Sequence, residues 1–169
     1  MANISKLQIE VEVTSQADEF FNTYRAKAHI VPKASSENVH GVEIHEGDFG
    51  SAGAIKTWTF NLDGKIQTIK GKIEVDEENK TITSTTIEGD VLNFYKSFLV
   101  ILQIIPKGEG SLVRWTWEYE KVDDDVPDPK KFQDLAVNLT KDVDSYVVKN
   151  VTVVIRYGDT TRLRRNKDN

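Results

Sequence analysis

The sequence predicts an α+β fold in which a curved antiparallel sheet of seven strands wraps around one long C-terminal helix. Two observations carry this prediction. Most of the chain alternates apolar and polar residues with a period of two, and turn signals such as Asp63-Gly64 separate the segments. Residues 132–147 instead space their apolar side chains as an amphipathic helix does. An antiparallel sheet with one apolar face must cover it, and this helix is the element able to do so.

The N-terminal part predicts a strand followed by two short helices. Residues 6–13 alternate strictly, which is typical of a half-buried strand. Ser15 then has the position of a helix N-cap, with Asp18 three residues later, and the apolar residues of 17–24 follow at helical spacing. A second short helix or turn reaches Pro32, because the residue before a proline disfavours the helical conformation.

Six further strands follow from the return of the two-residue period. A glycine-rich loop containing Gly47, Gly50 and Gly53 separates the first two of these strands. The predicted strands cover residues 39–45, 54–61, 65–75, 80–88, 91–105 and 112–121.

The long helix is the clearest element of the sequence. Asp128 has the position of its N-cap, and Pro129 suits the first helical position. Its apolar stripe extends toward Asn150 and consists of Phe132, Leu135, Ala136, Leu139, Val143, Tyr146 and Val147. The β-branched run of residues 151–155 either continues the frayed helix end or folds back as an extra strand, and both alternatives stay open.

Charge divides the chain into two parts. Residues 1–150 form the expected single domain and carry a net charge of −8, whereas residues 151–169 carry +3, which together give −5. We expect the second part to be a C-terminal extension whose basic end is disordered and solvated. Weak attraction of this end to an anionic partner is the alternative.

Composition excludes several classes of protein. The chain of 169 residues has no cysteine, which excludes a disulfide scaffold, a thiolate metal site and a cysteine nucleophile. Its acidic net charge argues against nucleic-acid binding, since phosphate contacts need a basic face. No secretory leader and no apolar stretch of about 20 residues are present, so we expect a cytoplasmic protein without a membrane span.

The sequence offers no recognisable catalytic or metal motif. The glycine-rich loop lacks the lysine and hydroxyl that follow the last glycine of a phosphate-binding loop, and a strand comes next. His29, His40 and His45 form no ligand pattern with neighbouring carboxylates, so we expect no metal and no cofactor. No Gly-x-Ser-x-Gly sequence indicates a nucleophilic serine.

The predicted interior combines aromatic walls with hydroxyl groups. Trp115, Trp117 and Tyr119 share one face of the last strand, and the strand of residues 80–88 places hydroxyls inside whichever face it buries. The helix offers only Ala136 in the middle of its stripe. A solid core would fill such positions with larger aliphatic residues, whereas a ligand cavity is mostly apolar with a few polar groups. From the residues alone, a packed core and a cavity both remain open.

Six short strings follow one another along the chain. They are Val31-Pro32-Lys33-Ala34, Glu46-Gly47-Asp48 through Gly53-Ala54-Ile55-Lys56, Glu88-Gly89-Asp90, Tyr95-Lys96-Ser97-Phe98, Ile105-Pro106-Lys107 and Trp117-Glu118-Tyr119-Glu120-Lys121. In this order they resemble the major latex protein subfamily of the birch-pollen-allergen superfamily, the Bet v 1 type or class-ten pathogenesis-related proteins. The resemblance covers about residues 4–150 and implies the helix-grip fold of that superfamily. It also implies a large cavity for amphipathic small molecules, a plant source and a role in defence or stress responses.

With this resemblance, the sequence predicts a carrier for a hydrophobic or amphipathic plant metabolite such as a sterol, flavonoid, cytokinin or fatty acid. His29, Ile30 and the glycine-rich loop would form the rim of the cavity. The expected lining residues are Tyr24, Ile30, Trp58, Phe60, Ile82, Ser84, Thr86, Phe98, Val100, Leu102, Val113, Trp115, Trp117, Tyr119, Phe132, Ala136, Leu139 and Val143.

An enzyme that acts on a plant specialised metabolite by general acid or base catalysis is the alternative. Lys121 and Lys96 are its candidate catalytic residues, but the sequence shows no inward lysine paired with a carboxylate, so we favour a protein that is not an enzyme. Leu99 and Ile101 are expected on the outer face of the sheet. The chain is therefore expected to be a monomer or a weak homodimer that associates through these two residues.

Overall fold

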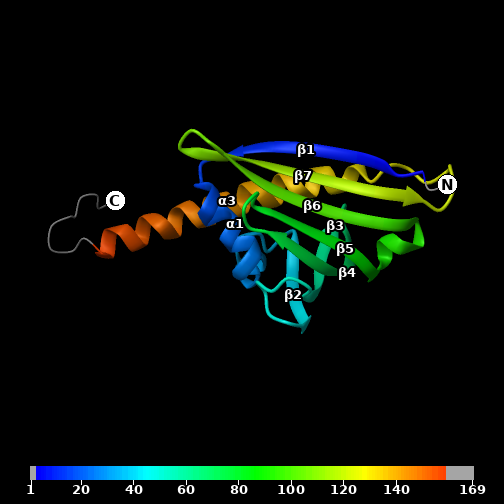
Figure 1. The fold of residues 1–169 in the computed structure, drawn as a ribbon, viewed down its shortest axis with the longest axis horizontal. Coiled ribbons are helices and arrows are strands. Elements are labelled where there is room, and N and C mark those ends of the chain that lie inside the picture. The colour runs from blue at the N-terminus through cyan, green and yellow to red at the C-terminus, as the bar shows by residue number, and fades with distance from the viewer. Residues whose placement is uncertain (1–2, 159–169) are drawn as a thin grey trace.

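The computed structural model describes residues 3–158, and the side chains of residues 3–149. Within this range it confirms the α+β class, with seven antiparallel strands in one sheet of order β1-β7-β6-β5-β4-β3-β2 (Figure 1). Each strand pairs with its neighbour in the chain except that β1 pairs with β7. The strands are β1 (Ser5–Val13), β2 (Val39–Glu46), β3 (Ile55–Leu62), β4 (Lys65–Asp76), β5 (Thr81–Gly89), β6 (Tyr95–Lys107) and β7 (Gly110–Lys121).

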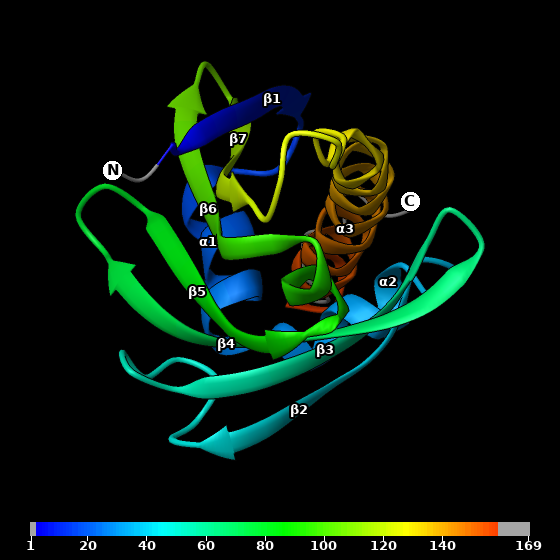
Figure 2. The same ribbon diagram turned by 90° about the vertical axis from the view of Figure 1, so that its right-hand side faces the viewer.

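The helices lie on the concave side of this sheet. The sheet curves around the long helix α3 (Lys130–Gly158), and α1 (Ala17–Ala26) and α2 (Val31–Ala34) lie beside it (Figure 2). Short 3-10 turns, η1 (Ala28–Ile30) and η2 (Asp90–Asn93), complete the order of elements. The predicted grip of the sheet on the terminal helix is therefore confirmed.

Two aspartates of α3 fix it to the N-terminal helices. The Asp144 carboxylate accepts hydrogen bonds from the backbone N–H groups of Thr14 and Ser15, at 3.1 and 2.8 Å, just before α1. Two residues earlier in α3, the Asp142 carboxylate accepts a hydrogen bond of 2.7 Å from the Ser35 hydroxyl, just after α2. These bonds set the position of α3 relative to the short helices, and with it the space left between α3 and the sheet.

The structure corrects both predicted N-caps. Gln16 is the residue before α1 and makes no side-chain capping bond, because the Ser15 hydroxyl donates to Asp144 instead. The long helix begins at Lys130, and the carboxylate of the expected cap, Asp128, accepts a hydrogen bond of 2.6 Å from the Tyr119 hydroxyl. In both cases the side chain that local spacing assigned to the helix end is hydrogen-bonded to a residue of another element instead.

The predicted start of β6 at Val91 is also wrong. Asp90–Asn93 form the turn η2, and the pairing of β6 with β7 is shifted between Tyr95 and Ser97. Phe94, expected inside by its spacing from Phe98, is therefore 55% exposed, and Tyr95 is buried in its place. A register irregularity of this kind reverses the faces of the residues that precede it.

The rings of Tyr95, Phe98 and Tyr119 form a packed aromatic cluster at the start of β6. The Tyr95 centroid lies 5.5 Å from that of Phe98 and 5.4 Å from that of Tyr119. Their hydroxyls are used, since Tyr95 donates to the Pro127 carbonyl at 2.6 Å and Tyr119 donates to Asp128. This end of the interior is a filled core.

The C-terminal segment resolves one open alternative. Residues 151–158 belong to α3, so the β-branched run continues the helix and does not return as a strand. The basic end predicted to be disordered, residues 159–169, lies outside the described residues.

Candidate functional site

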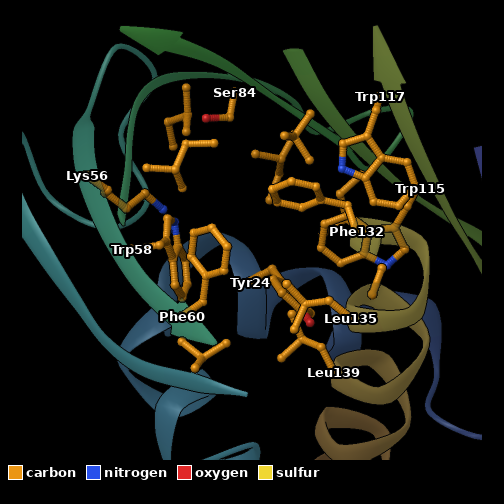
Figure 3. A pocket seen from close by; sticks show the side chains of 17 residues that line it. Tyr24, Lys56, Trp58, Phe60, Ser84, Trp115, Trp117, Phe132, Leu135 and Leu139 are labelled. Carbon is orange, nitrogen blue, oxygen red and sulfur yellow. The ribbon is translucent and has the colours of Figure 1, made fainter. Parts of the chain in front are cut away.

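A cavity of about 160 Å³ lies between the sheet and α3. Figure 3 shows its walls: Lys56 and Trp58 on one side, Trp115 and Trp117 on the other, and Leu135 and Leu139 of α3 below them. Apolar side chains make up most of the surface. The lining residues are Tyr24, Val39, Lys56, Trp58, Phe60, Ile69, Ile73, Ile82, Ser84, Val100, Leu102, Trp115, Trp117, Phe132, Leu135, Ala136 and Leu139.

Most residues that the sequence predicts as lining do lie on this cavity, and a smaller group does not. Phe98 and Tyr119 belong to the packed aromatic cluster, and Val113 and Val143 are fully buried elsewhere in the core. Thr86 is buried away from the cavity. Ile30, the remaining predicted residue outside the lining, borders a separate open groove beside α1.

The tryptophan wall is held in place by a buried hydrogen bond. The rings of Trp115 and Trp117 stack with centroids 6.3 Å apart and an interplanar angle of 13°. Trp115 Nε1 donates to the Thr140 hydroxyl of α3 at 2.9 Å, and Thr140 is completely buried. A hydroxyl in the middle of the helix thus satisfies the polar tip of the indole and fixes the ring that faces the cavity.

The Tyr24 hydroxyl on α1 lacks a partner. Its ring meets that of Trp115 edge-on at 5.8 Å, and the residue is only 6% exposed. Among the residues that the structure describes, none hydrogen-bonds to this buried hydroxyl. Burial, and then the charge of Asp142, raise the pKa of Tyr24, so the hydroxyl stays protonated and can donate to a guest.

The sequence reasoning missed the lining residues Val39, Ile69, Ile73 and Leu135 and, most consequentially, Lys56 on β3. It is 3% exposed, although lysine is almost never fully buried without a partner. Its Nζ donates one long hydrogen bond of 3.4 Å to the Phe49 carbonyl and lies 6.0 Å from the centroid of the Trp58 ring. Burial lowers the pKa of Lys56 to about 8. The available signal was parity, because Lys56 shares the face of β3 that carries Trp58 and Phe60.

The Ser84 side chain reaches the cavity because Gly71, on the neighbouring strand β4, has no side chain to occupy the same space. A Cβ atom added to the buried Gly71 of β4 would lie 2.2 Å from the Ser84 hydroxyl oxygen. Only glycine leaves this space free, so Gly71 permits the Ser84 hydroxyl to be placed where Figure 3 shows it, at the edge of the cavity.

The glycine-rich loop covers the end of the cavity that contains Lys56. Gly47 and Gly53 have φ angles of +75° and +83°, which side chains other than glycine rarely adopt. Asp48 accepts hydrogen bonds from the Gly50 N–H at 3.0 Å and from the Ser51 hydroxyl at 2.7 Å, and these bonds lower its pKa. Phe49 lies between Asp48 and Gly50, and both its carbonyl and its ring contact the Lys56 amine.

One predicted rim residue joins this loop. The ring of His29 lies 5.6 Å from that of Phe49, so His29 and the glycine-rich loop meet at the same edge. His40 and His45 lie on β2, away from that contact. Among the described residues, no group of three or more histidine, cysteine, aspartate or glutamate side chains could hold a metal ion.

The two lysines proposed for catalysis lie outside the cavity. Lys96 is exposed and its Nζ lies 3.6 Å from Glu120, whereas the Nζ of Lys121 lies 3.2 Å from Asp128. Both amines therefore have carboxylate partners at the surface, and the amine that does reach the interior is Lys56.

Comparison with known proteins identifies the family. Residues 2–150 match the family described as "Pathogenesis-related protein Bet v 1 family". The chain belongs to this family. It is 40% identical over 148 residues to MLP-like protein 43 of Arabidopsis thaliana, which covers 86% of this chain and 94% of that protein. This similarity confirms the resemblance to the major latex proteins.

Solved structures of Bet v 1 type agree with the fold. Ginseng major latex-like protein 151 from Panax ginseng superimposes with a TM-score of 0.82 at 31% identity, covering 85% of this chain and 97% of the other. Norcoclaurine synthase from Thalictrum flavum superimposes with a TM-score of 0.66 at 19% identity, covering 88% of each chain. The second likeness shows the shared fold alone. No helix in the described part of the chain is long and apolar enough to cross a membrane.

Proposed function

We propose that this member of the Bet v 1 family binds a small hydrophobic or amphipathic molecule in the cavity between the sheet and α3. The observation that carries the proposal is the combination of an apolar surface with two polar groups that lack strong partners, the Tyr24 hydroxyl and Lys56 Nζ. A filled core pairs its buried polar groups, whereas a ligand site leaves a few of them for the guest.

Cavity size limits the guest. Pockets for drug-sized ligands enclose about 300–1,000 Å³, and this cavity encloses about 160 Å³. An apolar cavity of about 150 Å³ accommodates a single aromatic ring such as benzene. The structure as it stands therefore suits a guest of one ring or a short chain. A sterol or a flavonoid would require α3 to move away from the sheet.

The binding test uses an apolar dye whose emission rises on transfer from water. We expect saturable binding to one site, accompanied by quenching of tryptophan fluorescence, since three tryptophans line the cavity. Ala136→Leu, with Ala136→Trp as the stronger substitution, fills the middle of the α3 stripe and should weaken dye binding at least tenfold. Asn138→Trp adds the same ring on the exposed face of α3 and should leave binding unchanged. Equal affinity of the Ala136 and Asn138 variants would place the dye elsewhere and contradict the proposal.

The biological setting follows from the family resemblance and is part of the proposal. We infer a plant protein of the cytoplasm that carries or buffers its ligand during defence or stress responses. The weak homodimer is likewise a proposal. Leu99 and Ile101 are half-buried on the sheet, and sedimentation of the wild type against Leu99→Lys measures whether they mediate association.

A further inference from the structure

Lys56 has the properties of a nucleophile placed inside a largely apolar cavity. Among the residues that line the cavity it is the one with an amine, and no aspartate or glutamate accompanies it there. No carboxylate among the described side chains lies within ion-pair distance of its Nζ. A lysine that is desolvated in this way is activated for attack on carbonyl carbon, because more of it is uncharged near neutral pH.

We propose that Lys56 captures hydrophobic aldehydes reversibly inside the cavity, as an imine on its Nζ. The neutral nitrogen adds to the carbonyl carbon, and the carbonyl oxygen takes up the protons that the nitrogen loses. That oxygen then leaves as water while the carbon–nitrogen double bond forms. Amine and aldehyde thus give imine and water, without any oxidant, reductant or further reactant. This inference rests on the proposed binding function, since the aldehyde must enter the same cavity.

The surroundings of Lys56 favour an aldehyde over an acid as the guest. A carboxylate would have to lose its own hydration, and its attraction to the buried amine would repay little beyond that loss. A neutral carbonyl avoids this cost, and its apolar remainder can lie against Trp58 and Trp117 (Figure 3).

The ring of Phe49 and the cavity size narrow the class of aldehyde. Phe49 covers Lys56, with the Nζ 5.9 Å from the ring centroid. The other titratable groups at this loop are His29, Asp48, Arg25 and Lys72. A volume of about 160 Å³ fits an aldehyde with one aromatic ring or a short chain.

The test traps the imine on the full chain with benzaldehyde and sodium cyanoborohydride, which reduces an imine to a stable amine. Mass spectrometry of the intact protein counts benzyl groups, and peptide mapping locates them. At pH 7 an amine of pKa about 8 is neutral roughly 300-fold more often than one at the ordinary 10.5. We expect Lys56 to take up one benzyl group at least tenfold faster than any surface lysine, and peptide mapping separates this adduct from any label on the N-terminal amine.

Two variants accompany the wild type. Lys56→Met should abolish the rapid labelling, and Lys96→Met, which removes an exposed lysine, should leave the labelling unchanged. Because the modified residue is located on the wild type, the conclusion does not depend on whether the Lys56 variant folds.

The outcomes separate this inference from the proposed function. If the wild type binds the dye but benzaldehyde labels surface lysines as fast as Lys56, the aldehyde inference is overturned and the binding function stands. The same holds if hexanoate displaces the dye from wild type but not from Lys56→Met and no adduct forms, because Lys56 then acts as a counter-ion. If the dye does not bind at all, both proposals fail together.

Discussion

The packed aromatic cluster and the cavity lie on the same sheet, but they differ in whether their buried polar atoms have hydrogen-bond partners. In the cluster, the hydroxyls of Tyr95 and Tyr119 each have a hydrogen-bond partner at 2.6 Å. In the cavity, the Tyr24 hydroxyl has none among the described residues, and Lys56 Nζ has one long bond. Aromatic composition is similar at the two places, so composition does not distinguish them. The two places differ in the pairing of their buried polar groups.

This comparison predicts opposite responses to substitution. Side chains of the cluster should be needed for stability, because every atom there has neighbours and partners. Polar groups of the cavity should lower the stability of the empty protein, because no hydrogen bond replaces their lost hydration until a guest binds.

The largest effect is expected in the cluster. Phe98 is 1% exposed and packs between Tyr95 and Phe132, with ring centroids 5.5 and 5.2 Å away. Phe98→Ala should lower the free energy of unfolding by about 3–5 kcal/mol, measured by urea denaturation. Phe94→Ala, at an exposed ring four residues earlier, should change it by less than about 0.5 kcal/mol. Similar losses for the two variants would mean that the cluster is not tightly packed.

The next effect has the opposite sign and depends on pH. Burial lowers the pKa of Lys56 from 10.5 to about 8, so folding favours its neutral form. Below pH 8 the amine is charged in both states and the folded state is destabilised by about 3 kcal/mol, a penalty relieved as the pH rises from 8 to 10.5. Lys56→Met should therefore raise the Tm by several degrees at pH 7 and by much less at pH 10.

Thermal unfolding of both proteins at the two pH values measures this difference. Lys96→Met is the matched control, since an exposed and paired lysine should give no such gain. A stabilisation by Lys56→Met that is the same at pH 7 and pH 10 would show that packing, and not a buried charge, is responsible.

A smaller effect separates two buried tyrosines. Tyr119→Phe removes the hydrogen bond to the Asp128 carboxylate and should cost about 1.5–3 kcal/mol at pH 7. Tyr24→Phe removes a hydroxyl that has no partner and should be neutral or slightly stabilising. Urea denaturation of the two variants measures the contrast, and equal losses would indicate that a partner for Tyr24 exists in solution.

The smallest effect is the acid dependence of the Tyr119 variant. The hydrogen bond from Tyr119, followed by that from Lys121, lowers the pKa of Asp128. A depressed carboxyl pKa stabilises the fold above the unfolded-state pKa, and this contribution is lost as the pH falls through the folded-state value. The stability difference between wild type and Tyr119→Phe should thus shrink in acid. NMR titration should show the Asp128 pKa moving upward in the variant, and an unchanged value would contradict the assigned cause.

Sequence patterns predicted those parts of the fold that depend on periodicity. The alternation of apolar residues placed all seven strands, and Asp63-Gly64 does form a turn in which both residues have positive φ, 52° and 88°. The start of β6 was not predictable in this way, because the irregularity between Tyr95 and Ser97 arises from pairing with β7. The same limit applies to Ser15 and Asp128, whose hydrogen-bond partners, Asp144 and Tyr119, belong to other elements of the fold.

The site was less predictable than the fold for a physical reason. Facing inward follows from parity, so Trp58, Trp115 and Trp117 could be assigned to the interior. Whether an inward side chain meets a neighbour or a void depends on the distance between α3 and the sheet, which the bonds of Asp142 and Asp144 set. Lys56 shares the parity of Trp58 in the sequence. It was not predicted to face inward, because a lysine side chain is seldom fully buried.

The central claim is that the sheet and α3 enclose a void able to hold a guest, and diffraction from crystals of the full chain soaked in benzene tests it most directly. The account predicts one ring of density bounded by Trp58, Trp117 and Leu139, with the protein backbone unmoved. Indole rings in contact with α3, with no space and no density between them, would contradict it.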